Sequence, residues 1–153
     1  MTIINLISPD LAHDLCIEIT ADLPEWFGQP DNVHYAKGVS IRTSFVAVIE
    51  GKHVGLITLE FPYLNNANIY WMGILKDFHD QGLGKQLILA AEKYALSKGA
   101  TSLTVETLSP TENDANYNKT YNFYLKIGFS PLFDLKPYSP DQAMVYMYKT
   151  LRI

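Results

Sequence analysis

The 153-residue chain is 48% hydrophobic and 18% charged, a composition that supplies a packed core and excludes an intrinsically disordered chain. Its length predicts one domain, residues 1–153. Twelve Lys and Arg against sixteen Asp and Glu give a net charge of −4 without a basic run, so nucleic acid is not the expected partner.

The single cysteine, Cys16, excludes an intrachain disulfide and a cysteine-based metal site within this sequence. The first ten residues lack a basic segment followed by a long apolar run, and the longest apolar stretches have the length of strands. We therefore expect a cytoplasmic protein with no metal and no membrane partner.

The first predicted elements are a strand and a helix. Residues 2–6 have the pattern of a strand, and Ser8 can cap a helix whose first position suits Pro9. Apolar residues recur at helical spacing up to Ile19, and Pro24 disfavours a helical conformation in the residue before it. The helix is therefore expected to end near residue 23.

A loop with two aromatic residues, Trp26 and Phe27, follows this helix. The pair either lines a binding site or pins the loop to the core, and the sequence does not separate these interpretations. A second, short helix is predicted from Pro30 or Asp31 to residue 37, with Gly38 as its end.

The middle of the chain predicts three strands. Residues 45–49 and 54–61 flank the turn Glu50-Gly51-Lys52 and predict a hairpin. The next strand, residues 67–75, is apolar on both faces and is therefore expected at the centre of a sheet. Strict alternation places one set of side chains on one face and a second set on the other, namely Ile69, Trp71 and Gly73 against Tyr70, Met72 and Ile74.

The remaining elements are read from apolar periodicity and turn residues. They are a helix over 84–98 ended by Gly99, a strand over 103–108, a polar loop over 109–116, a helix from about 117 to 127, and strands over 129–135 and 143–150. This order of strands and helices predicts a mixed α/β fold.

A glycine-containing loop, His79–Lys85, joins the central strand to the long helix. Gly82 and Gly84 allow the backbone to turn sharply, and the helix start presents free N–H groups and a positive dipole end to an anion. A plain turn into a helix is the alternative. The segment fits neither a P-loop nor the dinucleotide fingerprint, whose third glycine would stand at Leu87.

Residues 71–84 resemble the acetyl-CoA loop of the GCN5-related N-acetyltransferases (GNAT). The pattern of that loop is Arg or Gln, two residues, Gly, one residue, and Gly or Ala. Here His79 stands where Arg or Gln is usual, which removes a permanent charge beside the pyrophosphate.

A second motif, residues 121–129, resembles the closing helix of the same family, where an aromatic residue and a tyrosine precede a Gly-Phe pair. Tyr124 lies four residues before Gly128. The two motifs come in the family's order with one strand between them, and the resemblance covers residues 45–129. It extends to a group of small bacterial acetyltransferases whose acceptors are mostly unassigned.

The resemblance implies a single-domain α/β fold with a central mixed and mostly antiparallel sheet, a splayed central strand pair and about four flanking helices. It implies acetyl-CoA as the acetyl donor. Backbone groups of Met72, Gly73 and Ile74 would hold its pantetheine and thioester, and Gly73 would let it approach closely. The pyrophosphate would lie against His79, Asp80, Gln81, Gly82, Leu83, Gly84 and Lys85. Homodimers are frequent in this family, so a homodimer is an expected partner.

Acetyl transfer to an amine needs a neutral amine, a polarised thioester carbonyl and a proton for the departing thiolate. The resemblance makes Tyr124 the candidate general acid, with core packing as the alternative. The central strand has no carboxylate, so Glu106 and Glu60 on neighbouring strands are the nearest candidates for the base, acting directly or through water. Each of the two could instead be an ordinary solvated carboxylate.

The second predicted helix borders the acceptor site in the family, so Glu25, Trp26, His34 and Tyr35 are the candidate substrate-binding residues. For His34 the alternative is a histidine that simply faces solvent. Tyr117 occupies the position, seven residues before the tyrosine, where the family often has an Asn that contacts CoA or the acceptor.

The function predicted is N-acetylation of a primary amine of a small molecule or peptide, with acetyl-CoA as donor and no metal. The alternative from another class is a non-catalytic acyl-CoA-binding or sensing domain. A plain α/β interaction domain is a third interpretation, which any CoA-dependent thermal shift would exclude.

Overall fold

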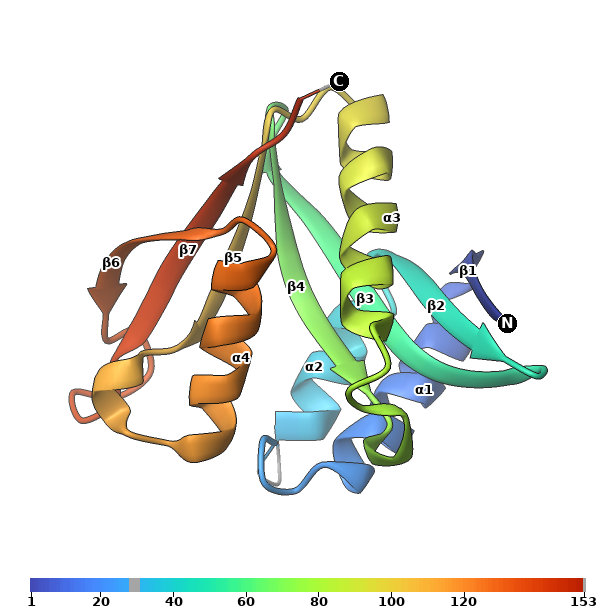
Figure 1. Ribbon diagram of the computed structural model, residues 1–153, viewed down its shortest axis with the longest axis horizontal. Coiled ribbons are helices and arrows are strands. Elements are labelled where there is room, and N and C mark those ends of the chain that lie inside the picture. The colour runs from blue at the N-terminus through green and yellow to red at the C-terminus, as the bar shows by residue number, and fades with distance from the viewer. Residues whose placement is uncertain (28–30, 153) are drawn as a thin grey trace.

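A computed structural model describes residues 1–27 and 31–152, with backbone only for residues 31–33 (Figure 1). In this part of the chain the strands and α-helices are β1 (Thr2–Ile7), α1 (Pro9–Asp22), α2 (Asp31–Val39), β2 (Thr43–Ile49), β3 (Lys52–Tyr63), β4 (Asn66–Ile74), α3 (Leu83–Ser97), β5 (Ser102–Leu108), α4 (Ala115–Lys126), β6 (Ser130–Leu135) and β7 (Met144–Thr150). Short 3₁₀ turns at Lys76–Phe78 and Pro110–Glu112 precede α3 and α4.

The strands described form one mixed sheet in the order β1-β2-β3-β4-β5-β7-β6. β4 and β5 are parallel, and every other neighbouring pair is antiparallel. A mixed, mostly antiparallel sheet with four helices was the fold expected from the sequence, and it is confirmed. β4 lies at the centre of the order, as its apolar faces predicted.

The sheet splits between β4 and β5. β4 pairs with β3 as far as Ile74. In contrast, β4 pairs with β5 only over Asn66–Ile69, which lie opposite Ser102–Val105. Beyond this point β5 continues alongside β7, and the carboxyl ends of β4 and β5 diverge in a V (Figure 1). The predicted splay of the central strand pair is thereby confirmed, and one edge of β4 is left without a strand neighbour over residues 70–74.

Helices cover both faces of the sheet. α1 and α2 lie behind it and α3 and α4 in front of it in the view of Figure 1. α1 begins as the sequence predicts, because the Ser8 side chain accepts a hydrogen bond from the Leu11 N–H (3.4 Å) and Pro9 occupies the first turn. Most of the largest fully buried side chains come from α1, β3 and α3, among them Ile19, Leu56, Ile57, Leu59, Leu87 and Ile88.

The sequence predicted that Gly38 ends the second helix, but Gly38 lies inside α2. A Cβ at this position would overlap the hydroxyl and ring of Tyr70 on β4. The glycine is therefore needed for the close approach of α2 to β4 and not for a helix terminus.

The prediction that side chains alternate strictly between the two faces of β4 was also wrong. The register with β3 pairs Thr58 with Trp71 but Leu59 with Ile69, so Tyr70 is an extra residue, a β-bulge. Tyr70 contacts α2, while a Cβ on Gly73, two residues after Trp71, would meet the Trp71 ring and Ile19 of α1. Tyr70 and Trp71 therefore both point to the face covered by α1 and α2.

Several boundaries differ from expectation by one or two residues, and two of them have a clear cause or consequence. Lys52 begins β3 and does not belong to the turn. α4 begins at Ala115, two residues before the predicted start, because Asp114 caps it by accepting from the N–H groups of Asn116 and Tyr117 (3.0 Å each). No helix within residues 1–27 or 31–152 has the length and apolar character needed to cross a membrane.

Candidate active site

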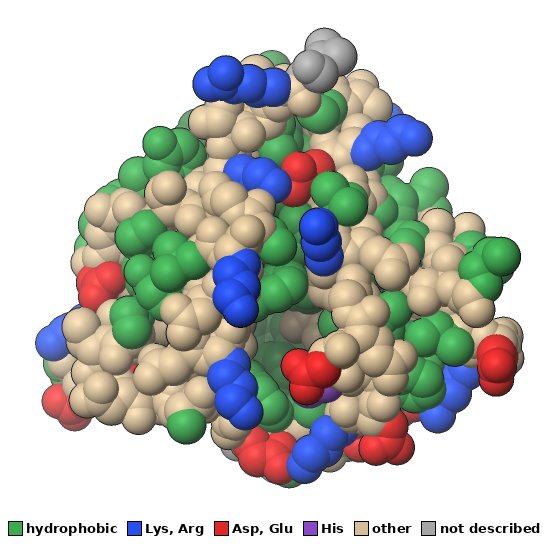
Figure 2. All heavy atoms as spheres, in the orientation of Figure 1, with side chains coloured by type: hydrophobic (Ala, Val, Ile, Leu, Met, Phe, Trp, Pro, Cys, Tyr) green, Lys and Arg blue, Asp and Glu red, His purple; other side chains and the backbone are tan. Residues whose placement is uncertain are grey.

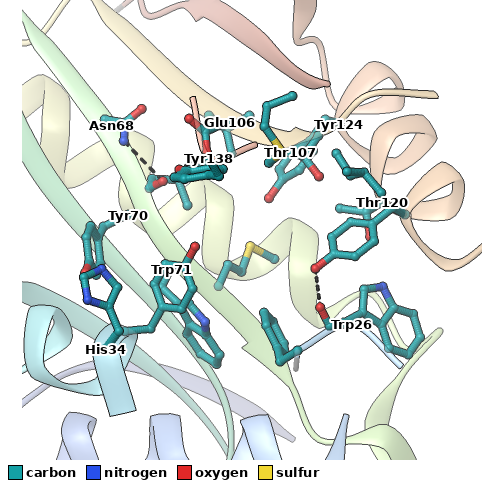
Figure 3. Close-up of a pocket in the computed structure, with 18 of the residues that line it drawn as sticks. Trp26, His34, Asn68, Tyr70, Trp71, Glu106, Thr107, Thr120, Tyr124 and Tyr138 are labelled. Atoms are coloured by element: carbon teal, nitrogen blue, oxygen red, sulfur yellow. Dashed lines mark hydrogen bonds between the residues drawn. The ribbon is translucent and has the colours of Figure 1, made fainter. Parts of the chain in front are cut away.

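A cavity of about 820 Å³ opens where β4 and β5 separate. Figure 2 shows the hollow between the two halves of the molecule, with hydrophobic side chains inside it. Its described walls come from the loop after α1, from α2, from β3, β4 and β5, from α4, and from the segment between β6 and β7. Residues far apart in sequence thus share one cavity because the splay leaves room for them (Figure 3).

The cavity gathers seven of the residues predicted to form the site, namely Trp26, His34, Tyr35, Glu60, Met72, Glu106 and Tyr124, and also Phe27 and Tyr117. Glu25, Gly73, Ile74 and the loop His79–Lys85 are not among its lining residues. The candidate catalytic residues and most of the candidate acceptor-binding residues therefore line one cavity, and the candidate phosphate loop lies beside it.

Tyr124 lies on α4 and reaches the cavity opposite β5. Its side chain is only 5% exposed and packs edge-on against the rings of Phe123 and Phe129, at centroid distances of 5.4 and 5.3 Å. Burial, and secondarily the neighbouring Tyr117, raise the pKa of Tyr124 well above that of a free tyrosine. Its hydroxyl therefore keeps its proton at neutral pH, as a proton donor must.

Glu106 projects from β5 and is held by two tyrosine hydroxyls. Tyr138, between β6 and β7, donates to Glu106 Oε1, and Tyr146, paired with Glu106 across β5 and β7, also donates to this carboxylate. Burial first, and then the hydrogen bond to the carboxylate, raise the pKa of both tyrosines. The two donors are neutral, so they orient Glu106 and leave its negative charge in place.

Glu60 lies at the opposite wall and is paired with a cation. Arg42 Nη2 lies 3.3 Å from Glu60 Oε1, and the Asn68 amide donates to Oε2 at 2.9 Å. The Arg42 guanidinium also stacks over the Tyr70 ring, 4.0 Å from its centroid. Glu60 is thus a fixed member of a network that joins β3 to the bulged part of β4.

The loop after α1 forms one side of the cavity mouth. The Tyr117 hydroxyl donates to the Trp26 backbone carbonyl and so ties α4 to this loop, a bond that Figure 3 marks beside the Trp26 label. The Phe27 ring lies 5.4 Å from that of Trp71. Phe27 therefore packs on β4, as the second interpretation of the aromatic pair predicted, whereas Trp26 lines the cavity and its contact with an acceptor stays a prediction.

Glu25 faces away from the cavity. Its carboxylate lies 3.2 Å from the Lys76 ammonium on the 3₁₀ turn that follows β4. A backbone hydrogen bond, and then Lys76, hold the pKa of Glu25 below its usual value. The pair links the loop after α1 to the end of β4.

His79 is turned toward β4 and not toward the helix start. Its Nε2 lies 2.7 Å from the Ile74 carbonyl oxygen, and its ring meets that of Trp26 edge-on at 5.7 Å. The residue that replaces the usual Arg or Gln thus ties the candidate phosphate loop to the end of the central strand.

The start of α3 has the features of an anion site. Asp80 and Gly82 both have positive φ, +62° and +78°, which turns successive N–H groups of the loop outward. The first bond of the helix runs from the Gln86 N–H to the Gly82 carbonyl, so the N–H groups of Leu83, Gly84 and Lys85 precede it. The first turn contains no acidic residue, and no side chain caps it. This end of α3 can therefore accept a phosphate group.

Gly84 and Gly73 have packing reasons for lacking a side chain. A Cβ on Gly84 would lie 2.9 Å from Phe123 Cζ of α4 and 3.2 Å from Met72 Cε. A Cβ on Gly73 would lie 2.6 Å from the Trp71 ring and 2.8 Å from Ile19 Cγ2. Each glycine thus lets another element approach, α4 in one case and α1 in the other.

Several cavity residues were not singled out from the sequence. They are chiefly Asn68, Tyr70, Thr107, Tyr138 and Gln142. A β-bulge aims Tyr70, and cross-strand pairing brings the region of Tyr138 and Tyr146 to Glu106. Neither feature has a local sequence pattern. Within the described residues, no cluster of His, Cys, Asp and Glu is suited to a metal ion.

Comparison with known proteins places this geometry in a family. Residues 12–129, well over half of the chain, match the acetyltransferase (GNAT) family. The aminoglycoside N(6′)-acetyltransferase type 1 of Salmonella typhimurium is 30% identical over 95 residues, which cover 54% of this chain. The match covers 66% of that relative's own length, just under two thirds.

Two solved structures share the fold over almost the whole chain. The ribosomal-protein-S18-alanine N-acetyltransferase of Escherichia coli superposes with a TM-score of 0.79 at 17% identity, covering 100% of this chain and 96% of that one. An aminoglycoside 6′-N-acetyltransferase complexed with coenzyme A gives a TM-score of 0.74 at 20% identity, covering 99% and 98%. With the two motifs, the splayed sheet and the family match over residues 12–129 in agreement, this chain belongs to the acetyltransferase (GNAT) family.

Proposed function

We propose that the chain is an N-acetyltransferase that moves the acetyl group of acetyl-CoA directly to a primary amine of a small molecule or peptide. The observation that carries the proposal is the cavity in the splay. It brings Tyr124 from α4, Met72 from β4 and Glu106 from β5 around one space, beside the free start of α3.

The cofactor-binding residues fit a long, anionic donor. The N–H groups at the start of α3 would bind the pyrophosphate, helped by the exposed Lys85. The edge of β4 over Met72, Gly73 and Ile74 has no strand neighbour on the β5 side, so its backbone groups there can bind the pantetheine amides. When bound, the donor supplies a thioester carbonyl and a thiol leaving group.

In the transfer, the amine nitrogen bonds to the carbonyl carbon, the carbon–sulfur bond breaks, and the sulfur leaves as a thiolate. We assign Tyr124 the proton that the thiolate takes up. Burial keeps this hydroxyl protonated, and Tyr124 of α4 lines the same cavity as Met72 of β4.

The attacking amine must lose a proton, and we assign its acceptance to Glu106, directly or through water. Two neutral hydroxyls orient this carboxylate, which is not in any ion pair among the described residues. Glu60 is the weaker candidate, because Arg42 and Asn68 already hold its two oxygens. Trp26, His34 and Tyr35 would line the acceptor side, with Glu25 positioning the loop through Lys76.

The proposal is tested by mixing the purified protein with acetyl-CoA and a panel of primary amines while free thiol is followed. Amine-dependent thiol release with acetylated amine detected by mass spectrometry supports it. The competing function is an acyl-CoA-binding or sensing domain. Saturable acetyl-CoA binding in a thermal-shift assay, with no thiol release for any amine, would establish that function instead.

A further inference from the structure

The charges around the cavity are few. Two carboxylates, Glu60 and Glu106, contribute to the described walls, and no Lys or Arg side chain does. Arg42, behind the wall, neutralises Glu60 at 3.3 Å. Among the described residues, one negative charge without an ion-pair partner, that of Glu106, therefore faces the space where an acceptor would lie.

Glu106 is prepared to bind one cation. A carboxylate offers about four lone-pair positions for hydrogen bonds, and Tyr138 and Tyr146 occupy two of them. The remaining positions can accept from an ammonium group, whose bond to a charged oxygen is stronger than a bond to a neutral one. Since the two tyrosines fix the carboxylate, little side-chain freedom is lost on binding.

Many of the residues that line the cavity are aromatic. Tyr35 and Tyr70 meet edge-on at 5.9 Å, and Trp26, Trp71 and Tyr138 also line the cavity. Such rings bury apolar surface and attract a cation through their faces. They suit a ligand with an apolar body that carries a positive group at one end.

Some of the polar side chains of the walls are engaged with the protein. Asn68 donates to Glu60 and accepts from Thr104 Oγ1 at 2.7 Å, and the Thr120 hydroxyl donates to the Asn116 carbonyl at 3.4 Å. A hydroxyl-rich acceptor would lose its hydrogen bonds to water, and these engaged groups do not replace them. Among the described residues, a second or third ammonium group would be desolvated with no carboxylate opposite it except Glu60, which is paired with Arg42.

We propose that the acceptor is a monoamine with an apolar or aromatic body, and that Glu106 binds its ammonium group. The inference rests on the proposed function and specifies its substrate class. It separates this chain from its aminoglycoside N(6′)-acetyltransferase relatives, which are named for an aminoglycoside acceptor.

The test compares amines that differ in one property. Hexylamine and 1,6-diaminohexane differ in one charge, 2-phenylethylamine adds an aromatic ring, and kanamycin supplies a hydroxylated polycation. We expect kcat/KM for hexylamine and 2-phenylethylamine to exceed the values for 1,6-diaminohexane and kanamycin by about tenfold or more, because a second charge stays unpaired. Equal or higher values for the two polycations would overturn the inference and leave the proposed function intact.

Two variants test the part played by the charge. Glu106→Gln keeps the shape of the side chain and should lower kcat/KM for both monoamines by about tenfold or more. Glu50→Gln, in the exposed turn between β2 and β3, makes the same change in net charge away from the cavity and should change nothing. Unaltered monoamine kinetics in Glu106→Gln would contradict the proposal.

A gain of charge gives the opposite test. Gln142 is exposed at the cavity wall, and Gln142→Glu would add a second carboxylate with almost no change in shape. The ratio of kcat/KM for 1,6-diaminohexane to that for hexylamine should rise several-fold, and an unchanged ratio would count against charge pairing as the basis of selection. If no amine at all releases thiol, the proposed function fails, and the substrate class fails with it.

Discussion

The two sides of the splay recognise their ligands in different ways. On the side of α3, the candidate donor site consists of backbone N–H groups, two residues with positive φ and a strand edge. On the side of α2, the candidate acceptor site consists of side chains, with aromatic rings around one carboxylate. Tyr124 lies between them on α4.

This difference has a physical consequence. Backbone donors are present whatever the side chains are, so a donor site made of them tolerates sequence change provided that its glycines remain. An acceptor site made of side chains changes its ligand with each substitution. A family can therefore keep one donor while its members diverge in acceptor. Substitutions on the two sides should affect different kinetic constants.

The largest effect is expected from the residue between the two sides. Tyr124→Phe keeps the ring and its packing and removes the proton donor. Turnover should fall on the order of 10²-fold or more, with acetyl-CoA affinity and amine KM nearly unchanged. Single-turnover acetylation measures this, provided that chemistry limits the rate.

The matched control is Tyr121→Phe, which makes the same chemical change on the same helix at a residue outside the cavity lining. It should retain the wild-type rate. Wild-type rates in both variants would mean that the Tyr124 hydroxyl is structural and that water protonates the thiolate.

A second effect should fall on the acceptor side alone. In Gly38→Ala the new methyl group would overlap Tyr70, which must move with the wall it forms. Ala normally favours a helix over Gly by up to about 1 kcal/mol, but overpacking of this kind costs about 1–3 kcal/mol. We expect lower stability in urea and a higher amine KM, with the acetyl-CoA dissociation constant unchanged.

The double variant Gly38→Ala/Tyr70→Ala checks the cause. If the overlap with Tyr70 is responsible, the two substitutions together should cost less than the sum of their separate effects. Additive costs, or a Gly38→Ala protein more stable than the wild type, would show that α2 and β4 are not in the tight contact described.

The buried hydroxyl also predicts an alkaline effect. Burial raises the pKa of Tyr124, whereas in the unfolded chain a tyrosine titrates near pH 10. Above about pH 10 the unfolded chain loses this proton and the folded protein keeps it, so the free energy of unfolding falls as the pH rises. One such group contributes a slope of up to about 1.4 kcal/mol per pH unit.

Urea unfolding of the wild type and of Tyr124→Phe between pH 9 and 11.5 isolates that contribution, because Tyr138 and Tyr146 are common to both proteins. The stability difference between the two should be constant below about pH 10 and shift in favour of the variant above it. A difference that does not change with pH would mean that the hydroxyl is hydrated in the folded protein.

The sequence predicted the fold and the donor side of the splay better than the acceptor side. Helix caps, turn glycines and apolar periodicity are local, and they predicted the order of the strands and helices and the start of α1 at Ser8. The resemblance of residues 71–84 and 121–129 to known motifs then indicated the splayed sheet. Gly38 was misplaced because its partner, Tyr70, is distant in sequence and the contact leaves no local pattern.

The acceptor side depends on features that only the folded chain shows. The bulge at Tyr70 moves the Tyr70 side chain to the face of the sheet that Trp71 also occupies. Hydrophobic periodicity alone does not reveal where the alternation of faces along a strand breaks. Glu106 acquires its two hydroxyl partners because β7 lies between β5 and β6 in the sheet. Residues whose role depends on cross-strand register could not be assigned from the sequence.

The smallest predicted effect lies on the donor side and concerns charge at the start of α3. Gln81 is exposed just before Gly82, and its side chain makes only a long contact, 3.5 Å, with the Asp77 carbonyl. Gln81→Glu adds a negative charge beside the N–H groups that would bind the pyrophosphate, and Gln81→Lys adds a positive one. Exposed charges at a helix terminus contribute about 0.3–1 kcal/mol, so acetyl-CoA affinity should change by about two- to fivefold.

Two measurements on these variants, acetyl-CoA affinity and stability, should change with opposite sign, so even a small effect can be interpreted. Glu at a helix start stabilises the free protein slightly and should weaken acetyl-CoA binding, whereas Lys should do the reverse. Binding and stability would then change in opposite directions, which partial unfolding cannot produce. Both shifts should shrink at high salt, and the amine KM at saturating acetyl-CoA should stay constant. Titration calorimetry at two salt concentrations measures the affinities, and equal values for the two variants would place the pyrophosphate away from this helix.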